Sequence, residues 1–127
     1  MNGIQTKMNK PTTTFELYEV VKVPFPFTET RKAKIRPALI LSTAKHFNAK
    51  IGSSIMAMIT SLKLDQTLWP SDVVIKNLRS AGLPVPSLIR FKIFTLDHRL
   101  VLGHVGNLSM LDRHHVQIQL KRILSIP

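Results

Sequence analysis

The sequence predicts a small twisted β-barrel closed by one C-terminal helix, and three observations lead to this fold class. Residues 20–27 alternate between apolar and other side chains, as a half-buried strand does. Residues 35–41 and 55–59 are apolar runs of strand length, whereas helices usually need ~10 or more residues. After Gly106 the apolar spacing changes to that of a helix. The chain should therefore be mainly β with a helix at its end.

The first strand should end at a sheet edge. Its apolar face carries Val21, Val23, Phe25 and Phe27. Pro24 lacks a backbone donor, so the far part of this strand should lie at an edge or leave the ladder there. The two apolar runs should form central strands, and residues 62–86 should hold one short strand between two loops.

The last third of the chain predicts a hairpin followed by the helix. Residues 87–96 alternate, with Arg90 and Lys92 on the outward side, and residues 100–105 can return as the other arm after a turn at residues 97–99. Ser109 and Asp112 then resemble a capping box. The helix should bury an apolar stripe made of Val116, Leu120, Ile123 and Leu124.

Length and composition indicate one domain over residues 15–127, preceded by a flexible basic arm over residues 1–14. The arm carries Lys7 and Lys10 and lacks the apolar core of a secretory signal. The chain has no cysteine, which excludes disulfides and thiolate metal sites. No apolar stretch approaches the ~18 residues of a membrane helix, so we expect no membrane association.

Charge favours a polyanionic partner. The chain has 18 Lys and Arg against 7 Asp and Glu, a net charge of +11, and residues 30–64 hold basic residues with no acidic one. Nucleic acid fits this charge, and an acidic protein partner fits it equally well.

Two polar features stand out on the predicted central strands. Arg36 interrupts an apolar run, and the next run ends in Thr60 and Ser61. Burying a charge in a strand is unfavourable, so a functional role is one explanation for Arg36, and pairing with a nearby carboxylate at a sheet edge is the other. A Thr-Ser strand end is ordinary in itself.

These residues carry a resemblance to the MazF/PemK family of toxin ribonucleases, over roughly Glu16 to Leu124. The resemblance lies in Tyr-Glu-Val-Val-Lys-Val-Pro-Phe-Pro-Phe-Thr at residues 18–28, Arg-Pro-Ala-Leu-Ile-Leu-Ser at 36–42, Ile-Thr-Ser at 59–61 and Gly-His-Val-Gly-Asn-Leu-Ser at 103–109. It implies an SH3-like barrel of the CcdB/MazF/Kid type, a homodimer, a cognate acidic antitoxin, and cofactor-free cleavage of single-stranded mRNA that inhibits translation and growth. A bacterial cytoplasmic location follows from the same resemblance.

The family's catalytic arginine and threonine match Arg36 and Thr60. RNA cleavage without a metal uses the 2′-hydroxyl as nucleophile, and negative charge builds on the phosphorane oxygens. Arg36 can donate to that phosphate in a forked geometry, and Thr60 can hold a non-bridging oxygen through its hydroxyl or its amide. The remaining candidates for RNA binding are Arg31, Lys32, Lys34, Ser61, Lys63 and Trp69. Trp69 could stack on an unpaired base or pack in the core.

The proton acceptor is the least defined of the expected groups. Glu29 precedes Arg36 in the loop between the first two strands, and Glu19 occupies the family's usual acidic position. Glu29 is favoured, although it could equally be a solvated carboxylate that pairs with Arg31 or Lys32. The histidines show no ligand spacing typical of zinc, so no metal site is expected.

The chain departs from better-known members at Tyr18, where a glycine is usual, and at Lys92 and Phe94, where many have glutamine and arginine. The family's RNA sequence preference therefore does not transfer. Two other functions remain open. One is a CcdB-like poison of DNA gyrase, which acts through its last helix and cuts nothing. The other is a catalytically weak, basic RNA-binding protein.

Overall fold

The computed structural model describes residues 14–25 and 34–127. The predicted arm over residues 1–14 lies outside the described residues except for Thr14. The elements are β2 (Glu19–Phe25), β3 (Lys34–Ile40), η1 (Ala44–Asn48), α1 (Ala49–Ile51), β4 (Ser53–Ser61), β5 (Val73–Val74), α2 (Leu78–Ala81), β6 (Ser87–Asp97), η2 (His98–Leu100), β7 (Gly103–Asn107) and α3 (Met110–Leu124).

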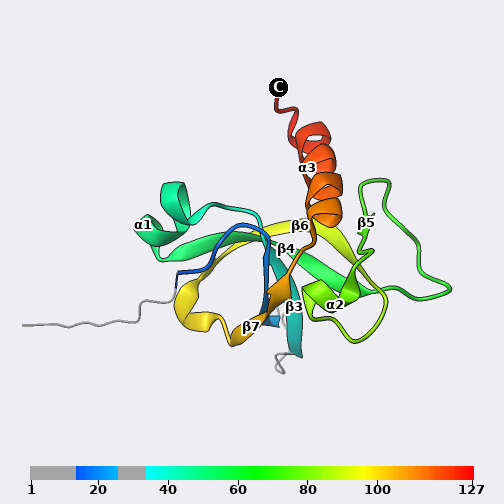
Figure 1. Ribbon diagram of the computed structural model, residues 1–127, viewed down its shortest axis with the longest axis horizontal. Coiled ribbons are helices and arrows are strands. Elements are labelled where there is room, and N and C mark those ends of the chain that lie inside the picture. The colour runs from blue at the N-terminus through cyan, green and yellow to red at the C-terminus, as the bar shows by residue number, and fades with distance from the viewer. Residues whose placement is uncertain (1–13, 26–33) are drawn as a thin grey trace, which may run out of the picture.

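One antiparallel sheet organises the described residues, with strand order β5-β6-β4-β3-β2-β7. It curls into a half-barrel, and α3 projects from it (Figure 1). The mainly β fold with a C-terminal helix is therefore confirmed. The two apolar runs form β3 and β4, which lie in the middle of the sheet as predicted.

Buried side chains form one cluster on each face of the sheet. The first face carries Val20, Leu39, Ala57, Ile59, Ile89 and, from α3, Val116. The second face carries Phe15, Val21, Val23, Ala38, Ile40, Met56 and Leu96. Because successive residues of a strand point to opposite faces, β2, β3 and β4 supply both clusters. Such strands read as continuous apolar runs, which explains the sequences of β3 and β4.

The first strand behaves as its prolines predict. β2 pairs with β3 along its length, but β7 pairs only with residues 19–22, so Pro24 faces an open edge on that side. Tyr18, just before β2, has φ +72°. This left-handed conformation favours glycine and is uncommon for a bulky residue. The Tyr18 ring nevertheless packs against the first cluster.

The predicted hairpin between residues 87–96 and 100–105 is wrong. β6 continues to Asp97, η2 follows, and β7 pairs with β2 instead of β6. The backbone amide of Leu102 already donates to the carbonyl of Lys22, at 2.8 Å. The chain therefore crosses from β6 to β2, on the far side of β4 and β3, and β7 forms an edge of the sheet.

The C-terminal helix begins as predicted. Ser109 is its N-cap, and its hydroxyl accepts from the amide of Asp112 at 3.3 Å. Val116 is fully buried and Leu120 packs against the same cluster. However, Ile123 and Leu124 are 42% and 52% exposed, so the predicted stripe is buried only in its first half. The helix does not close the barrel over its whole length.

Short helical segments were not expected from the sequence. The polar sequence from His46 to Ser54 predicts a connecting loop or a bent hairpin, but η1 and α1 occupy residues 44–51, and α1 ends at Gly52 with φ +77°. Residues 62–86 contain the predicted short strand, β5, but also the four-residue helix α2. These segments are too short to show a helical apolar period.

Candidate functional site

Arg36 and Thr60 lie on the same face of neighbouring strands. β3 and β4 pair through Ala38 with Met58, and the pairing ends there although both strands continue. Counting two residues further along each strand sets Arg36 across from Thr60. Both follow their paired neighbours on the second face, because side chains two residues apart in a strand point the same way. The two predicted catalytic residues therefore flank the place where the ladder ends.

Neither of these side chains is engaged elsewhere in the described part of the chain. Arg36 and Thr60 are both half-buried. Within residues 14–25 and 34–127, Arg36 makes no ion pair and neither side chain makes a hydrogen bond. The pairing of Arg36 with a carboxylate, the alternative considered from sequence, is not seen among these residues. Two donors are thus available to a ligand at the end of the sheet.

Further basic and polar candidates extend this end of the sheet. Lys34 is exposed at the start of β3, and Ser61 is half-buried at the end of β4. Lys63 is exposed in the loop after β4, where its amide donates to the Gln66 side chain at 3.1 Å. Glu29, Arg31 and Lys32 lie outside the described residues.

Arg90 adds a charged residue that sequence reasoning placed on the outward side and did not propose for the site. It pairs with Met58 across β4 and β6, so it shares the face of Thr60. Diagonal neighbours of this kind lie ~7–8 Å apart. The alternation expected for β6 fails here because its register with β4 shifts between Ala57 and Met58. As a result Ile93, on the apolar side of the expected pattern, is 41% exposed.

Arg90, Asp72 and Trp69 form a compact cluster beside Thr60. The Arg90 guanidinium donates to both carboxylate oxygens of Asp72, at 3.1 and 2.7 Å, and to the carbonyl of Thr67 at 3.1 Å. The hydrogen bonds to the Asp72 carboxylate raise the pKa of Arg90 above its ordinary value. The guanidinium also lies 4.8 Å from the Trp69 ring centroid. Arg90 thus fixes the loop after β4 against β6.

Trp69 is not a core residue. It belongs to neither buried cluster, and it remains 39% exposed. The Lys92 ammonium lies 5.8 Å from its ring centroid. The core-packing explanation for Trp69 is therefore wrong, and an exposed indole among cations remains.

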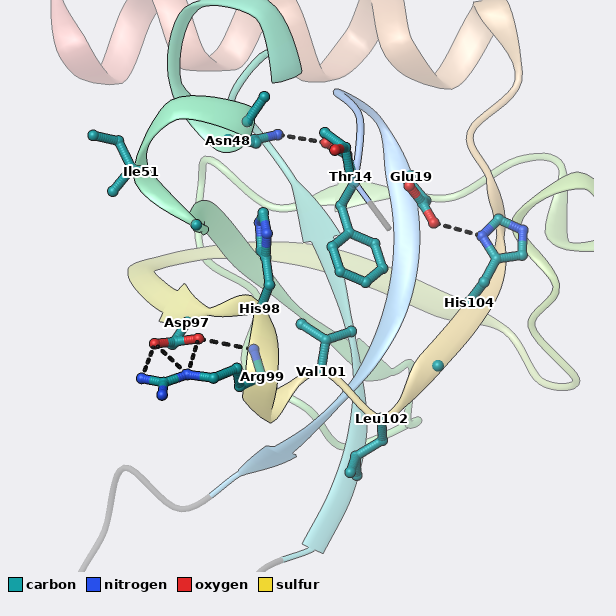
Figure 2. A pocket seen from close by; sticks show the side chains of 14 residues that line it. Thr14, Glu19, Asn48, Ile51, Asp97, His98, Arg99, Val101, Leu102 and His104 are labelled. Atoms are coloured by element: carbon teal, nitrogen blue, oxygen red, sulfur yellow. Dashed lines mark hydrogen bonds and ion pairs between the residues drawn. The ribbon is translucent and has the colours of Figure 1, made fainter. Parts of the chain in front are cut away.

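The opposite end of β4 has a different character. A pocket of about 890 Å³ opens there, between η2, α1 and the residues before β2 (Figure 2). Glu19 lines it and bonds His104, with 2.7 Å between Oε2 and Nδ1. Glu19 stands four residues before Val23, the partner of Arg36, which is ~13 Å along the strand. It is therefore remote from Arg36 and poorly placed as a proton acceptor there.

Several polar side chains at this pocket make hydrogen bonds within the protein. Asn48, fully buried, donates to the carbonyls of Phe15 and Ser42, both at 2.8 Å, and accepts from the Ser42 hydroxyl. His98 bonds Ser54, with 2.7 Å between Nε2 and Oγ. Burial lowers the pKa of His98 below its ordinary value. These bonds hold η1, η2 and the start of β4 together.

The described part of the chain offers no group of three or more His, Asp or Glu side chains that could hold a metal ion. Among the same residues, no helix is long and apolar enough to cross a membrane.

The fold and the site together define a small, basic half-barrel protein whose Arg36 and Thr60 side chains, at one end of the sheet, have no partner among the described residues. Residues 16–124 match the family described as the PemK-like, MazF-like toxin of type II toxin-antitoxin systems. The chain belongs to this family. The match spans both candidate catalytic residues and all described strands.

Solved structures share the fold. MazF from Deinococcus radiodurans is 18% identical, with a TM-score of 0.70 over 91% of this chain and 100% of that one. MazE-MazF from the same organism gives 19% identity and a TM-score of 0.71, with the same coverage. An endoribonuclease from a mycobacterial species is 14% identical, with a TM-score of 0.69 over 93% of this chain and 98% of that one. No curated protein matches the chain.

Proposed function

We propose that this chain is the toxin of a type II toxin-antitoxin system and acts as a sequence-specific endoribonuclease on single-stranded mRNA in the bacterial cytoplasm. One observation carries the proposal. Arg36 and Thr60 share a face where the β3–β4 ladder ends, and both side chains are unengaged among the described residues. Family membership supports the toxin class. Cleavage of mRNA would inhibit translation and growth.

The reaction needs no metal or cofactor if the substrate supplies its own nucleophile. The 2′-hydroxyl oxygen attacks the adjacent phosphorus, the bond to the 5′-oxygen breaks, and the products carry a cyclic phosphate and a 5′-hydroxyl. Arg36 donates to the phosphate oxygens as charge builds, and Thr60 holds a non-bridging oxygen. Glu29 is proposed to take the 2′-hydroxyl proton, and the leaving 5′-oxygen gains a proton from water.

The RNA would run over the basic end of the sheet. Lys34 and Lys63 are exposed on either side of the ladder end, and Ser61 follows Thr60 directly. Arg31, Lys32 and Trp69 complete the proposed binding set. Such contacts to phosphates make binding fall steeply with salt.

The test is incubation of a long single-stranded RNA with the purified protein in EDTA, followed by mapping of the new ends. We expect discrete cuts with 5′-hydroxyl ends, and a loss of about 10²–10³ in rate for Arg36→Ala. Arg79→Ala is the charge-matched control, because Arg79 is exposed on α2. Full activity of folded Arg36→Ala would refute the assignment. No cutting by the native protein would favour the gyrase-type or binding-only function.

We further propose that the protein acts as a homodimer. Several large apolar side chains are exposed, among them Ile35, Ile93, Ile118, Ile123 and Leu124. A stable interface usually buries ~1,200 Å² or more, and a second copy could cover such surfaces. Sedimentation equilibrium should give twice the chain mass; a monomer independent of concentration would refute the dimer.

The antitoxin is proposed to be an acidic, partly disordered segment that lies across the basic end of the sheet and folds on binding. The net charge of +11 favours such a partner. One of the solved structures that share the fold is described as an endoribonuclease in complex with its cognate antitoxin. Inhibition of RNA cleavage by the antitoxin should weaken as salt is raised, and salt-independent inhibition would contradict this mode.

A further inference from the structure

We infer that Trp69 is a stacking site for an unpaired nucleobase next to the cleaved bond, and that Asp72 and Arg90 are the residues that position it. This inference rests on the proposed function for its substrate class. It goes further by naming the part of the RNA that is recognised and the side chains that hold the recognition element in place.

The backbone of Trp69 is held by hydrogen bonds to Asp72, and the indole packs against the Arg90 guanidinium. The amide of Trp69 donates to Asp72 Oδ2 at 2.8 Å, and the amide of Asp72 donates back to the carbonyl of Trp69 at 3.0 Å. Two nitrogens of the Arg90 guanidinium donate to the same carboxylate, and the guanidinium lies against the face of the indole. In the Arg90–Asp72 ion pair, the side chains are 15% and 3% exposed, so the pair is shielded from water. A ring held in this way loses little freedom when a base stacks on it.

The exposure of the indole is what a purely structural role does not explain. Trp69 keeps 39% of its surface open, and its neighbour Leu68 is 51% exposed. Tryptophan usually buries most of its large apolar surface. An indole that is fixed and exposed can therefore bind a flat apolar group. Nucleobases are such partners, and every base has a face that can stack.

The charges around the ring favour a polyanion, and nucleic acid combines such charge with flat apolar groups that can stack on the indole. Arg90 and Lys92 both lie within 6 Å of the ring centroid, at 4.8 and 5.8 Å. Arg90 is neutralised by Asp72, whereas Lys92 makes no ion pair with a described residue and can approach a phosphate. Because Arg90 is a diagonal neighbour of Thr60, a base on Trp69 flanks the bond that Thr60 is proposed to bind.

Trp69 is the only tryptophan in the chain, so its fluorescence reports on this site alone. The experiment titrates the native protein with a dye-labelled, single-stranded 2′-O-methyl RNA of mixed sequence. This RNA lacks the attacking hydroxyl and stays intact. Dye anisotropy measures total binding, and tryptophan emission measures stacking. We expect quenching by this RNA and none by an oligomer of abasic sites with the same phosphates.

Variants distinguish the stacking role of Trp69 from the positioning role of Asp72 and Arg90. Trp69→Ala should weaken binding by about five- to a hundredfold, and Trp69→Phe should recover most of it. Asp72→Asn and Arg90→Lys should reduce the quenching amplitude while the proteins stay folded. Asp97→Asn is the matched control, since Asp97, the last residue of β6, and Arg99 form an exposed pair of the same kind.

The outcomes distinguish this inference from the proposed function. RNA binding by anisotropy without tryptophan quenching, or equal quenching by the abasic oligomer, overturns the stacking site whether or not the protein cleaves RNA. Unchanged quenching in folded Asp72→Asn and Arg90→Lys overturns the positioning role. Quenching by the mixed-sequence RNA together with no cleavage of ordinary RNA upholds the site and refutes the nuclease.

Discussion

The two ends of β4 show how one strand can serve structure at one end and chemistry at the other. At its start, Ser54 is fully buried and its hydroxyl bonds His98. At its end, the Thr60 and Ser61 side chains are half-buried and make no hydrogen bond with any described residue. Both ends carry small hydroxyl side chains, so the sequence of the strand alone does not distinguish them.

The difference lies in what surrounds each end. Around Ser54, the buried Asn48 supplies donors and acceptors that pair with Ser42 and the carbonyl of Phe15. Buried polar groups that are fully paired stabilise one arrangement of the chain. Around Thr60, the β3–β4 ladder ends, and the Arg36 and Thr60 side chains have no hydrogen-bond partner among the described residues. Substitutions at the Thr60 end should therefore change the rate of RNA cleavage but not the free energy of unfolding. Substitutions at the Ser54 end should lower the free energy of unfolding but leave the cleavage rate unchanged.

The largest expected effect belongs to Thr60. Thr60→Val keeps the shape and the strand preference but removes the hydroxyl, and we expect RNA cleavage to fall by about 10²-fold or more. The free energy of unfolding should change little, because that hydroxyl has no partner among the described residues. Initial cleavage rates and urea unfolding measure the two quantities. Thr95→Val is the control, since Thr95 is an exposed threonine on β6. Equal rates for Thr60→Val and the native protein would refute a catalytic role for the Thr60 hydroxyl and leave only its backbone amide as a donor.

The next effect is on stability, at the other end of the strand. Asn48→Ala leaves the Ser42 hydroxyl and two buried carbonyls without their partner, which should lower the free energy of unfolding by about 3 kcal/mol. The folded fraction should still cut RNA at the native rate. Denaturant unfolding tests this, with the exposed Asn107→Ala as a matched control expected to stay within about 0.5 kcal/mol. A loss of activity in folded Asn48→Ala would show that the two ends are not independent.

Much of the central sheet could be predicted from the sequence because its pattern is local. The apolar runs of β3 and β4 and the Ser109 cap of α3 depend on neighbouring residues, and each was found where expected. The partner of β7 is different. Alternation identifies a strand but not the strand beside it, so the sequence favours the shorter connection, a hairpin with β6, whereas β7 pairs with β2.

The same contrast between local patterns and long-range pairing applies to the candidate site. Arg36 and Thr60 stood out because each breaks a local pattern, and the resemblance joined them. Arg90 did not stand out, because simple alternation places it on the outward face of its strand. The register shift between β6 and β4 alters this alternation, and it depends on residues of both strands. Its partner Asp72 is distant in sequence, and no periodic pattern connects the two residues.

The smallest expected effect is on the pH dependence of stability at the structural end of β4. Burial against Phe15 lowers the pKa of His98 from its ordinary value of 6.5, while Asp97 and Glu19 act weakly in the other direction. The unfolded chain then binds a proton at a pH where the folded protein does not. The contribution of His98 to the free energy of unfolding is therefore fully present above about pH 6.5. It is lost as the pH falls from there through the pKa of His98 in the folded protein. Urea unfolding at pH 7.5 and pH 5 should show a smaller loss of stability for His98→Gln than for the native protein. His114→Gln, exposed on α3, should lose as much as the native protein. An equal loss in all three would mean that another group governs acid sensitivity, whereas the expected difference would show that His98 makes this end of the sheet sensitive to acid.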